Sequence, residues 1–205
     1  MTAEKALQML REIRDAAFAT VSKEGKPEVR IIDVMIVEGE KLYFCTSRGK
    51  EFHAQLLSSG FVAVTGLTKE FVSIRLTGRA DLLLDKKKWI DRIFRENPSM
   101  NDVYPGESRY ILDPFCIADG SIEVFDLGKT PIERESFVIG KGKTPEKGFR
   151  ITDQCIGCGT CAAGCPQQAI EEGTPYRIRQ NNCLHCGLCF ENCPVHAIRR
   201  LGDDG

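Results

Sequence analysis

The hydrophobic positions of the first part of the chain follow a helical period and then a strand period. Leu7, Leu10, Ile13 and Ala17 recur at helical spacing with charged residues between them, which predicts an amphipathic helix. Short runs rich in β-branched and aromatic residues follow, separated by brief breaks that contain glycine, as in antiparallel hairpins. The pattern predicts one helix followed by a β-rich region.

About six strands and three helices fit this pattern before residue 140. Strands are expected at 18–21, 29–37, 41–46, 61–67, 70–80 and 121–127, and further helices at 49–58 and 85–96. Strands joined by short turns, with few helices between them, favour an antiparallel barrel with its helices packed outside. We therefore expect a mainly β (α+β) fold in this region.

The pattern breaks near residues 140–149, in the segment IGKGKTPEKG. It is rich in lysine and glycine, contains a proline and shows no apolar periodicity, which is typical of a linker. We place the domains at 1–140 and 150–205, with the linker at 141–149. A chain of 205 residues has room for one medium domain and one small module.

Composition and charge narrow the class of protein. Hydrophobic residues make up 42% of the chain and charged residues 28%, as in soluble globular proteins. No apolar stretch is long enough for a transmembrane helix, and charges interrupt the region where a signal peptide needs an apolar core. We expect a cytoplasmic protein that binds neither membranes nor nucleic acid, since the net charge is only −1.

The ten cysteines are unevenly placed along the chain. Cys45 and Cys116 lie in the first domain, where we expect both to be small buried hydrophobic residues. The other eight fall in the last quarter of the chain. In a reducing cytosol such a cluster favours thiolate–metal chemistry over disulfides.

The eight clustered cysteines belong to an internal duplication. The stretch CIGCGTCAAGCPQQAI at 155–170 recurs as CLHCGLCFENCPVHAI at 183–198, and each copy has the form C-x₂-C-x₂-C-x₃-C-P. This is the bacterial ferredoxin arrangement for [4Fe–4S] clusters, in which the fourth cysteine ligates the other copy's cluster. We assign one cluster to Cys155, Cys158, Cys161 and Cys193, and the other to Cys183, Cys186, Cys189 and Cys165.

Structural zinc is the alternative for so many thiolates. Zinc sites usually take two separated C-x-x-C pairs, whereas each copy here adds a third cysteine at the same short spacing and a proline behind the fourth. The resemblance to two-cluster ferredoxins covers residues 150–200 and implies a small α+β ferredoxin-like domain.

A second chemical feature lies at the turn LYFCTSRGK, residues 42–50. Ser47 is placed to cap the helix that follows, and Arg48 and Lys50 put positive charge where the helix dipole favours acidic residues. Backbone amides, hydroxyls and cations gathered at a helix start suit a phosphate group. The alternative is a capped surface helix with solvated side chains.

The segment VRIIDVMIVEGEKLYFCTSRGKEFHAQLLSSGFVAVTGL, followed by VSIRLTGRA, resembles the FMN-binding split barrel of the pyridoxamine 5′-phosphate oxidase-like family. The resemblance spans residues 10–127 and implies two sets of site residues. The ribityl phosphate would be held by Arg30, Thr46, Ser47 and Lys50. The isoalloxazine edge would be lined by backbone of Ile31, Ile32 and Cys45, with Gln55 as a further residue of the site. Because the family builds this site at a homodimer interface, the resemblance also implies a homodimer.

The chain departs from the true oxidase in two respects. The substrate-binding Trp/Arg/His segment at that enzyme's C-terminus has no counterpart, and Met35 stands where a lysine is usual. We therefore expect no oxidation of vitamin B₆, and we identify no catalytic residue. The lysines at 86–88 are expected to form a solvated helix face.

Together the two halves join a flavin to two one-electron centres. We expect a flavin- and iron–sulfur-dependent oxidoreductase of an anaerobic metabolism, which moves electrons between the clusters and FMN and on to a small-molecule acceptor or a redox partner protein. FMN is expected rather than FAD, because the chain has no G-x-G-x-x-G turn for a pyrophosphate. The alternative is a non-enzymatic electron-transfer protein or redox sensor.

Overall fold

The computed structural model describes residues 1–202, which divide into two compact units. The first unit comprises Met1–Lys69, Ser73–Glu123 and Ser136–Thr144. The second comprises Glu70–Val72, Val124–Glu135 and the chain from residue 145 onward. One division therefore falls inside the segment expected to be a linker, and the end of a β-hairpin groups with the second unit.

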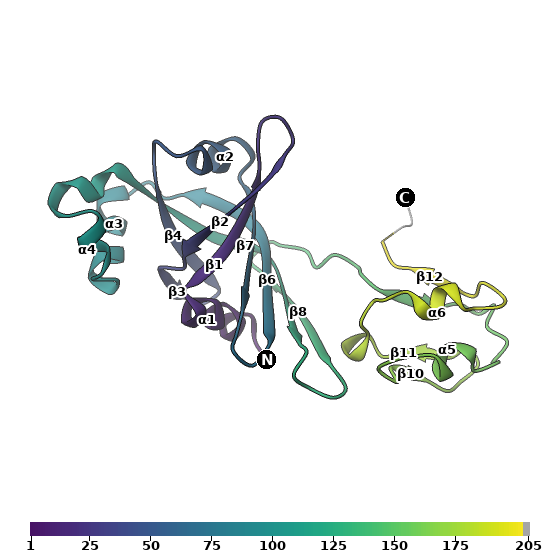
Figure 1. Cartoon of the computed structure of the whole chain (residues 1–205). Helices are drawn as coiled ribbons and strands as arrows, with labels where there is room; N and C mark the ends of the chain where they lie inside the picture. The colour runs from purple at the N-terminus through teal and green to yellow at the C-terminus, as the bar shows by residue number, and fades with distance from the viewer. Residues whose placement is uncertain (203–205) are drawn as a thin grey trace. The chain divides into compact units, whose positions relative to one another are not determined.

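The first unit is built on an eight-stranded sheet with helices around it (Figure 1). Along the sheet the strands run β2 (Pro27–Asp33), β1 (Asp15–Val21), β5 (Phe61–Leu67), β6 (Val72–Leu82), β7 (Leu112–Asp126), β4 (Lys41–Ser47) and β3 (Ile36–Glu38). An eighth strand, β8 (Glu133–Ile139), pairs with β7 off this path. This is the mainly β, split-barrel arrangement with outer helices that the sequence predicts.

Alternating burial explains why these segments are strands. In β5 the buried Val62 and Val64 alternate with the exposed Phe61 and Leu67, and β6 shows the same alternation. A period of two puts one side of each strand toward the core and the other toward the surface. The bulkiest fully buried side chains of the core are Phe18, Phe44, Phe94 and Phe115.

The N-terminal helix α1 (Ala3–Ile13) is present as predicted, with the Thr2 hydroxyl accepting a hydrogen bond from the backbone at its start. Ala17, which the helical spacing had included, lies in β1 instead. Arg14 takes φ 67° and ψ −65°, a positive-φ conformation outside the helical region that ends the helix and turns the chain into the strand. The helical spacing of the apolar residues therefore continues beyond the last residue of the helix.

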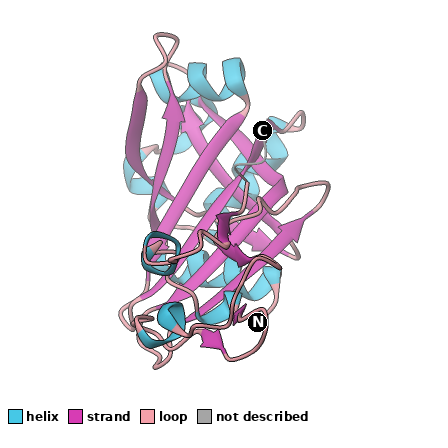
Figure 2. Cartoon of the chain, turned by 90° about the vertical axis from the view of Figure 1, so that its right-hand side faces the viewer, coloured by secondary structure: helices cyan, strands magenta, loops and turns pink. Residues whose placement is uncertain are grey.

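Two further helices, α2 (Glu51–Ser59) and α3 (Lys86–Glu96), match the expected ones, and Figure 2 separates helices from strands by colour. The strand expected at 29–37 is divided into β2 and β3, and the one expected at 121–127 is the end of the longer β7. The sequence did not predict β8, α4 (Met100–Val103) or the 3₁₀ helix η1 (Gly106–Ile111). In β8 the sequence ERESFVI begins with charged residues, which hides the strand pattern.

The second unit carries two small sheets and short helices. β10 (Ile170–Glu171) pairs with β11 (Arg177–Ile178), and β12 (Ile198–Arg200) pairs with β9 (Phe149–Ile151). The helical turns are α5 (Thr160–Ala163), η2 (Gln180–Asn182) and α6 (Leu188–Glu191). Among its described residues, Phe149, Ile170, Ile178 and Ile198 form a buried apolar cluster, against which cysteines pack.

The duplication in the sequence is also a duplication of backbone conformation. Gly159 and Gly187 precede α5 and α6 with φ 76° and 86°, and each occupies the same place in its copy. Gly157 has φ 70°, and its counterpart His185 takes the same left-handed region with φ 57° although it has a side chain. The loop conformation is therefore fixed by the repeat rather than by glycine at every position.

Candidate functional site

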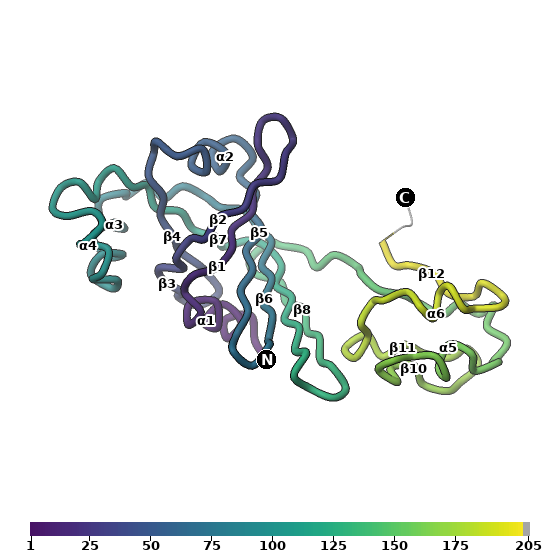
Figure 3. The backbone as a smooth tube through the Cα atoms, in the orientation of Figure 1, coloured from purple at the N-terminus to yellow at the C-terminus, as the bar shows by residue number. Residues whose placement is uncertain are grey.

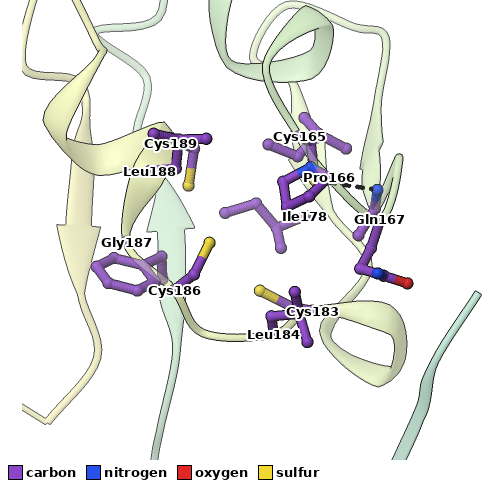
Figure 4. A pocket seen from close by; sticks show the side chains of 13 residues that line it. Cys165, Pro166, Gln167, Ile178, Cys183, Leu184, Cys186, Gly187, Leu188 and Cys189 are labelled. Atoms are coloured by element: carbon purple, nitrogen blue, oxygen red, sulfur yellow. Dashed lines mark hydrogen bonds between the residues drawn. The ribbon is translucent and has the colours of Figure 1, made fainter. Parts of the chain in front are cut away.

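Two cavities in the second unit are each lined by four cysteines. The residues that line the first cavity include Cys155, Cys158, Cys161 and Cys193. Those that line the second include Cys183, Cys186, Cys189 and Cys165. Each takes three cysteines from one loop and the fourth from the other copy, and Figure 4 shows the sulfur atoms of Cys183, Cys186 and Cys189 pointing into the second cavity. This grouping is the one that cross-ligation requires.

Backbone amides approach the sulfur atoms in the same way in both copies. The amide of Ala169 donates to Cys165 Sγ at 3.3 Å, and the amide of Ala197 donates to Cys193 Sγ at 3.3 Å. Hydrogen bonds of this kind stabilise negative charge on cluster thiolates. Isoleucines of the small core line both cavities, so each four-thiol set lies against an apolar wall. The donor set and its surroundings fit a [4Fe–4S] cluster in each cavity.

The predicted phosphate-binding residues lie where β4 ends and α2 begins. The Thr46 hydroxyl is buried and has no hydrogen-bond partner among the described residues. Leaving such a group unpaired costs about 1–3 kcal/mol, which a ligand oxygen would recover. Ser47 is half-buried and Lys50 is exposed. The orphaned hydroxyl therefore fits the phosphate of a bound nucleotide.

The start of α2 differs from the expectation in one detail. Ser47 does not cap the helix: Lys50 is the N-cap residue, and no side chain makes the capping hydrogen bond. The helix begins later than the spacing suggested because residues 47–50 form a turn, in which the Lys50 amide donates to the Ser47 carbonyl at 3.1 Å. Amide groups at the start of α2 thus lack a side-chain acceptor, which suits an anion.

Arg30 lies on β2 at the centre of a polar network that includes Gln55 of α2. Its guanidinium donates to Thr20 Oγ1 at 2.6 Å, to Glu28 Oε2 at 3.0 Å and to Gln55 Oε1 at 3.1 Å. The Gln55 amide in turn donates to Glu28 Oε2 at 2.9 Å. The guanidinium also lies 4.7 Å from the ring centre of Phe52. The structure therefore brings Arg30 and Gln55 together, and adds a carboxylate, Glu28, that the sequence analysis missed.

The residues expected along the isoalloxazine edge are placed differently from one another. Ile31 is exposed and Ile32 half-buried on β2, which forms the end of the sheet in the described chain. Cys45 is buried, and burial raises the pKa of its thiol to about 12. Burial likewise raises the pKa of Cys116 to about 11. Both thiols stay protonated at neutral pH, so they are the small buried residues that were expected and not nucleophiles.

Asp113 of β7 is a buried carboxylate that contacts three basic side chains, and the sequence analysis did not identify it. Its carboxylate lies 2.9 Å from His53 Nε2, 2.9 Å from Lys86 Nζ and 3.3 Å from Arg48 Nη1. Burial would raise the pKa of Asp113, but the hydrogen bonds from Lys86 and His53 outweigh it and lower the pKa. Lys86 is therefore an ion-pair partner of Asp113. The sequence analysis had instead expected it to belong to a solvated helix face.

The contacts of Asp113 fix the turn at residues 47–50, which carries predicted phosphate-binding residues. Arg48 is tied to Asp113 and to the Tyr110 carbonyl, at 2.8 Å, so its charge is already used within the protein. Asp113 also pairs with Thr46 in the β4–β7 register. The only sign of this in the sequence is one aspartate in an otherwise apolar stretch, LDPFCI.

Comparisons with known proteins match two separate parts of the chain. Residues 2–101 match the family described as Pyridoxamine 5'-phosphate oxidase, and residues 154–197 match the 4Fe-4S dicluster domain. The crystal structure of a nimc/nima family protein from Clostridium acetobutylicum is similar with a TM-score of 0.57 and 21% identity, over 67% of this chain and 92% of that one. At this identity the similarity shows the fold of the barrel.

The chain spans only part of the length of the curated relatives that it matches. A ferredoxin of Butyribacterium methylotrophicum is 57% identical over 30 residues, which are 15% of this chain and 54% of the relative. A component of the ion-translocating oxidoreductase complex of Vibrio vulnificus is 30% identical over 129 residues, which are 58% of this chain and 61% of the relative. The alignments thus span between about half and three fifths of these relatives.

The chain contains a pyridoxamine 5'-phosphate oxidase-like domain at residues 2–101 and a 4Fe–4S dicluster ferredoxin domain at residues 154–197, and the resemblances stated from the sequence are confirmed. The ferredoxin match also decides against structural zinc as the interpretation of the cysteine repeat. Within residues 1–202 no helix combines the length and the apolar character needed to cross a membrane.

Proposed function

We propose that this chain is an oxidoreductase that moves electrons between two [4Fe–4S] clusters and FMN, and from FMN to a small-molecule acceptor. One observation carries the proposal. The same chain has two four-cysteine cavities and a split barrel in which the buried Thr46 hydroxyl, where β4 ends and α2 begins, has no hydrogen-bond partner among the described residues. The Vibrio relative supports a redox role, because its name assigns it to an oxidoreductase complex.

The cysteine loops hold one cluster in each cavity. The grouping of the thiols in the two cavities supports the ligand sets assigned from the sequence, in which each copy supplies three ligands to its own cluster and one to the other. Each cluster carries one electron at a time, and FMN exchanges one or two, so the pair can convert single-electron transfer into two-electron chemistry.

The barrel residues bind and orient the flavin. Thr46, Ser47 and Lys50 hold the phosphate together with the uncapped amides at the start of α2, and Arg30 joins them from β2. Because Glu28 already forms an ion pair with the Arg30 guanidinium, a phosphate would compete with Glu28 for the same group. Backbone of Ile31, Ile32 and Cys45 lines the isoalloxazine edge, and Gln55 keeps Arg30 in place.

A second copy of the chain completes the site. The outer face of β2 and β5 exposes Val29 by 69%, Ile31 by 62% and Phe61 by 62%. β1 lies between these strands and presents Ala17 opposite Ile31 and Ala19 opposite Val29. Apolar side chains gathered on one sheet face typically mark an interaction surface. We therefore include a homodimer, with the flavin at its interface, in the proposal.

The proposal is tested with anaerobically purified, fully loaded protein. After chemical reduction of the clusters, we expect flavin reduction at a rate that does not depend on protein concentration, followed by turnover of a quinone, a nitro compound or free flavin. Flavin that remains oxidised beside reduced clusters, despite a more positive potential, would instead favour the non-enzymatic carrier or sensor.

A variant checks the flavin site separately. Lys50→Ala should lower FMN affinity by about 1.5–3 kcal/mol, because it removes a charge-assisted phosphate contact, and it should leave the cluster absorption intact. Lys41→Ala, at the opposite end of β4, is the matched control and should bind FMN normally. FAD, or no flavin, released from wild-type protein made in flavin-replete cells would contradict the proposed site.

A further inference from the structure

One position between the second and third cysteines differs in its chemistry between the two copies of the ferredoxin repeat. The first copy has Thr160 there and the second has Leu188. Each is the first residue of a helical turn, α5 in the first copy and α6 in the second, and both turns are labelled on the tube in Figure 3. The cysteines on either side line their cavities in both copies. The repeat therefore keeps the ligands and changes the residue between them.

The Thr160 side chain contacts a cysteine of the first cavity. Its hydroxyl oxygen lies 3.5 Å from Cys158 Sγ, which is a hydrogen-bonding distance for sulfur. The residue between them, Gly159, takes φ 76°, and this left-handed turn lets the chain fold back so that the next side chain reaches the cysteine. A sulfur bound to iron carries no hydrogen, so the hydroxyl is the donor in the loaded protein. Thr160 is thus placed to donate to a ligand of the first-cavity cluster.

The second copy has the same backbone turn without this donor. Gly187 precedes Leu188 with φ 86°, in the same left-handed region as Gly159. The Leu188 side chain has no oxygen or nitrogen, so it cannot donate to a sulfur, and it adds apolar atoms to the lining of the second cavity. The two copies therefore differ here in side-chain chemistry and not in loop conformation.

Backbone donors are present in both copies. The two alanine amides described above donate to equivalent cysteines, one in each copy. The His185 amide also donates to Cys183 Sγ at 3.4 Å, and Gly157, at the same position of the first copy, has an amide and a left-handed φ of its own. A substitution at Thr160 leaves all of these amides in place. The contribution of its hydroxyl can therefore be measured by itself.

We propose that Thr160 is a positioning residue that acts through Cys158: its hydroxyl donates to the cysteine sulfur and raises the reduction potential of the first-cavity cluster. The inference rests on the proposed function, since it requires a cluster in this cavity. Hydrogen bonds to the sulfurs are among the factors that set the potential of an iron–sulfur cluster. Reduction adds one negative charge, and a donor stabilises the more negative state more strongly. Leu188 gives the second cluster no such contribution.

The test is a redox titration of the fully loaded chain, followed by electron paramagnetic resonance. Cys161→Ser changes one ligand and so identifies the signal of the first-cavity cluster. Thr160→Val keeps the shape of the side chain but removes the hydroxyl, and it should lower the equilibrium constant for reduction of that cluster about threefold to tenfold, tenfold being about 59 mV for one electron. Thr160→Ser, which keeps the hydroxyl, should retain most of the potential. The second cluster should be unaffected in both variants.

A hydroxyl beside the same loop provides the matched control. The Thr174 hydroxyl oxygen lies 3.2 Å from the place that a Cβ at Gly157 would take, and within the described chain it makes no hydrogen bond to a cysteine. Thr174→Val should therefore leave both potentials unchanged. A spectroscopic readout complements the potentials: in D₂O, the reduced first cluster of the wild-type protein should lose the coupling of one more exchangeable proton than that of Thr160→Val.

The repeat also supplies the reciprocal variant. Leu188→Thr places a hydroxyl at the equivalent position of the second loop, and it should raise the equilibrium constant for reduction of the second cluster by a similar factor. Three results would overturn the inference: a Thr160→Val protein in which no potential moves, one in which both move equally, or a Leu188→Thr protein without a rise. Protein without iron and sulfide would refute the proposed function, whereas loaded protein with an inert Thr160 refutes only this inference.

Discussion

The two domains of this chain specify their sites in opposite ways. In the ferredoxin domain, three of the four ligands for each cavity lie within seven residues of sequence, from Cys155 to Cys161 and from Cys183 to Cys189. In the barrel, the residues around the phosphate-type turn come from β1, β2, β4, α2 and β7. A site of the first kind follows from spacing, and a site of the second kind depends on the core that brings distant strands together.

The same contrast appears in what holds each domain folded. The barrel buries large aromatic and aliphatic side chains in its own core, including Phe18, Phe44 and Phe115. The described part of the ferredoxin domain has a small buried cluster of four large apolar side chains, with cysteines packed around it. A domain this small commonly requires metal or disulfide crosslinks for stability. The comparison therefore predicts that the barrel folds by itself and that the ferredoxin domain folds with its clusters.

Removing the clusters gives the largest expected effect. Because metal binding and folding are one equilibrium in such domains, cluster loss should cost the ferredoxin domain of the order of 10 kcal/mol and unfold it. Amide exchange should become fast at Ile178 and stay slow at Leu76, which is fully buried in β6. Fast exchange at both would show that the barrel depends on the clusters, and slow exchange at both would show that the small core suffices.

Removing the buried carboxylate at Asp113 should have the opposite effect to cluster loss: it should destabilise the barrel and leave the ferredoxin domain intact. Asp113→Asn should lower the unfolding free energy of the barrel by about 2–4 kcal/mol, because Lys86, His53 and Arg48 lose a charged acceptor. Cluster absorption should not change. Chemical denaturation of the loaded protein, monitored separately by Trp89 fluorescence and by cluster absorption, measures the two effects.

The pH dependence of the same variant has a defined sign. The folded pKa of Asp113 is lowered, so its contribution to stability is present above the unfolded pKa of about 3.9 and is lost as pH falls through the folded value. Wild-type barrel should therefore lose stability more steeply below about pH 4 than Asp113→Asn. Equal slopes would mean that the carboxylate is not held ionised by its neighbours.

The contrast also explains how much the sequence could predict. Runs rich in β-branched and aromatic residues, bounded by turn residues, placed β5, β4 and most of β6, and the repeat led to the two four-cysteine sets that the cavities display. Asp113 and Glu28 were missed because their roles come from contacts with residues that strand pairing and helix packing bring near, such as His53, which lies sixty positions before Asp113. The hydrogen bond that the Ile132 amide donates to Gln167 Oε1 spans 35 positions and likewise leaves no local pattern.

A smaller effect is expected at Thr46, and its two parts have opposite signs. Thr46→Val replaces the orphaned hydroxyl with a methyl group of similar size, so the flavin-free barrel should gain about 1 kcal/mol of stability. FMN affinity should fall by a similar amount, since the phosphate loses a hydrogen-bond donor. Thermal unfolding and flavin titration measure the two changes. Loss of both stability and affinity would mean that the hydroxyl has a partner within the protein.

The smallest effect concerns Glu28, and it should improve binding. The carboxylate lies 3.0 Å from Arg30 Nη2 and accepts from Gln55, so it offsets the charge that a phosphate would use. Glu28→Gln keeps the size and a hydrogen-bonding oxygen but removes the negative charge, and because the pair is partly exposed we expect FMN affinity to rise by only about 0.5–1 kcal/mol.

Fluorescence titration with FMN and with riboflavin separates the causes. The gain should appear for FMN and be absent for riboflavin, which has no phosphate, and it should shrink as salt screens the charges. An equal gain for both flavins would place Glu28 beside the isoalloxazine instead, and no gain for either would mean that phosphate binds without Arg30. Glu24→Gln, on the neighbouring turn and hydrogen-bonded to Ser22, is the matched control for removing one acidic charge from this face of the barrel.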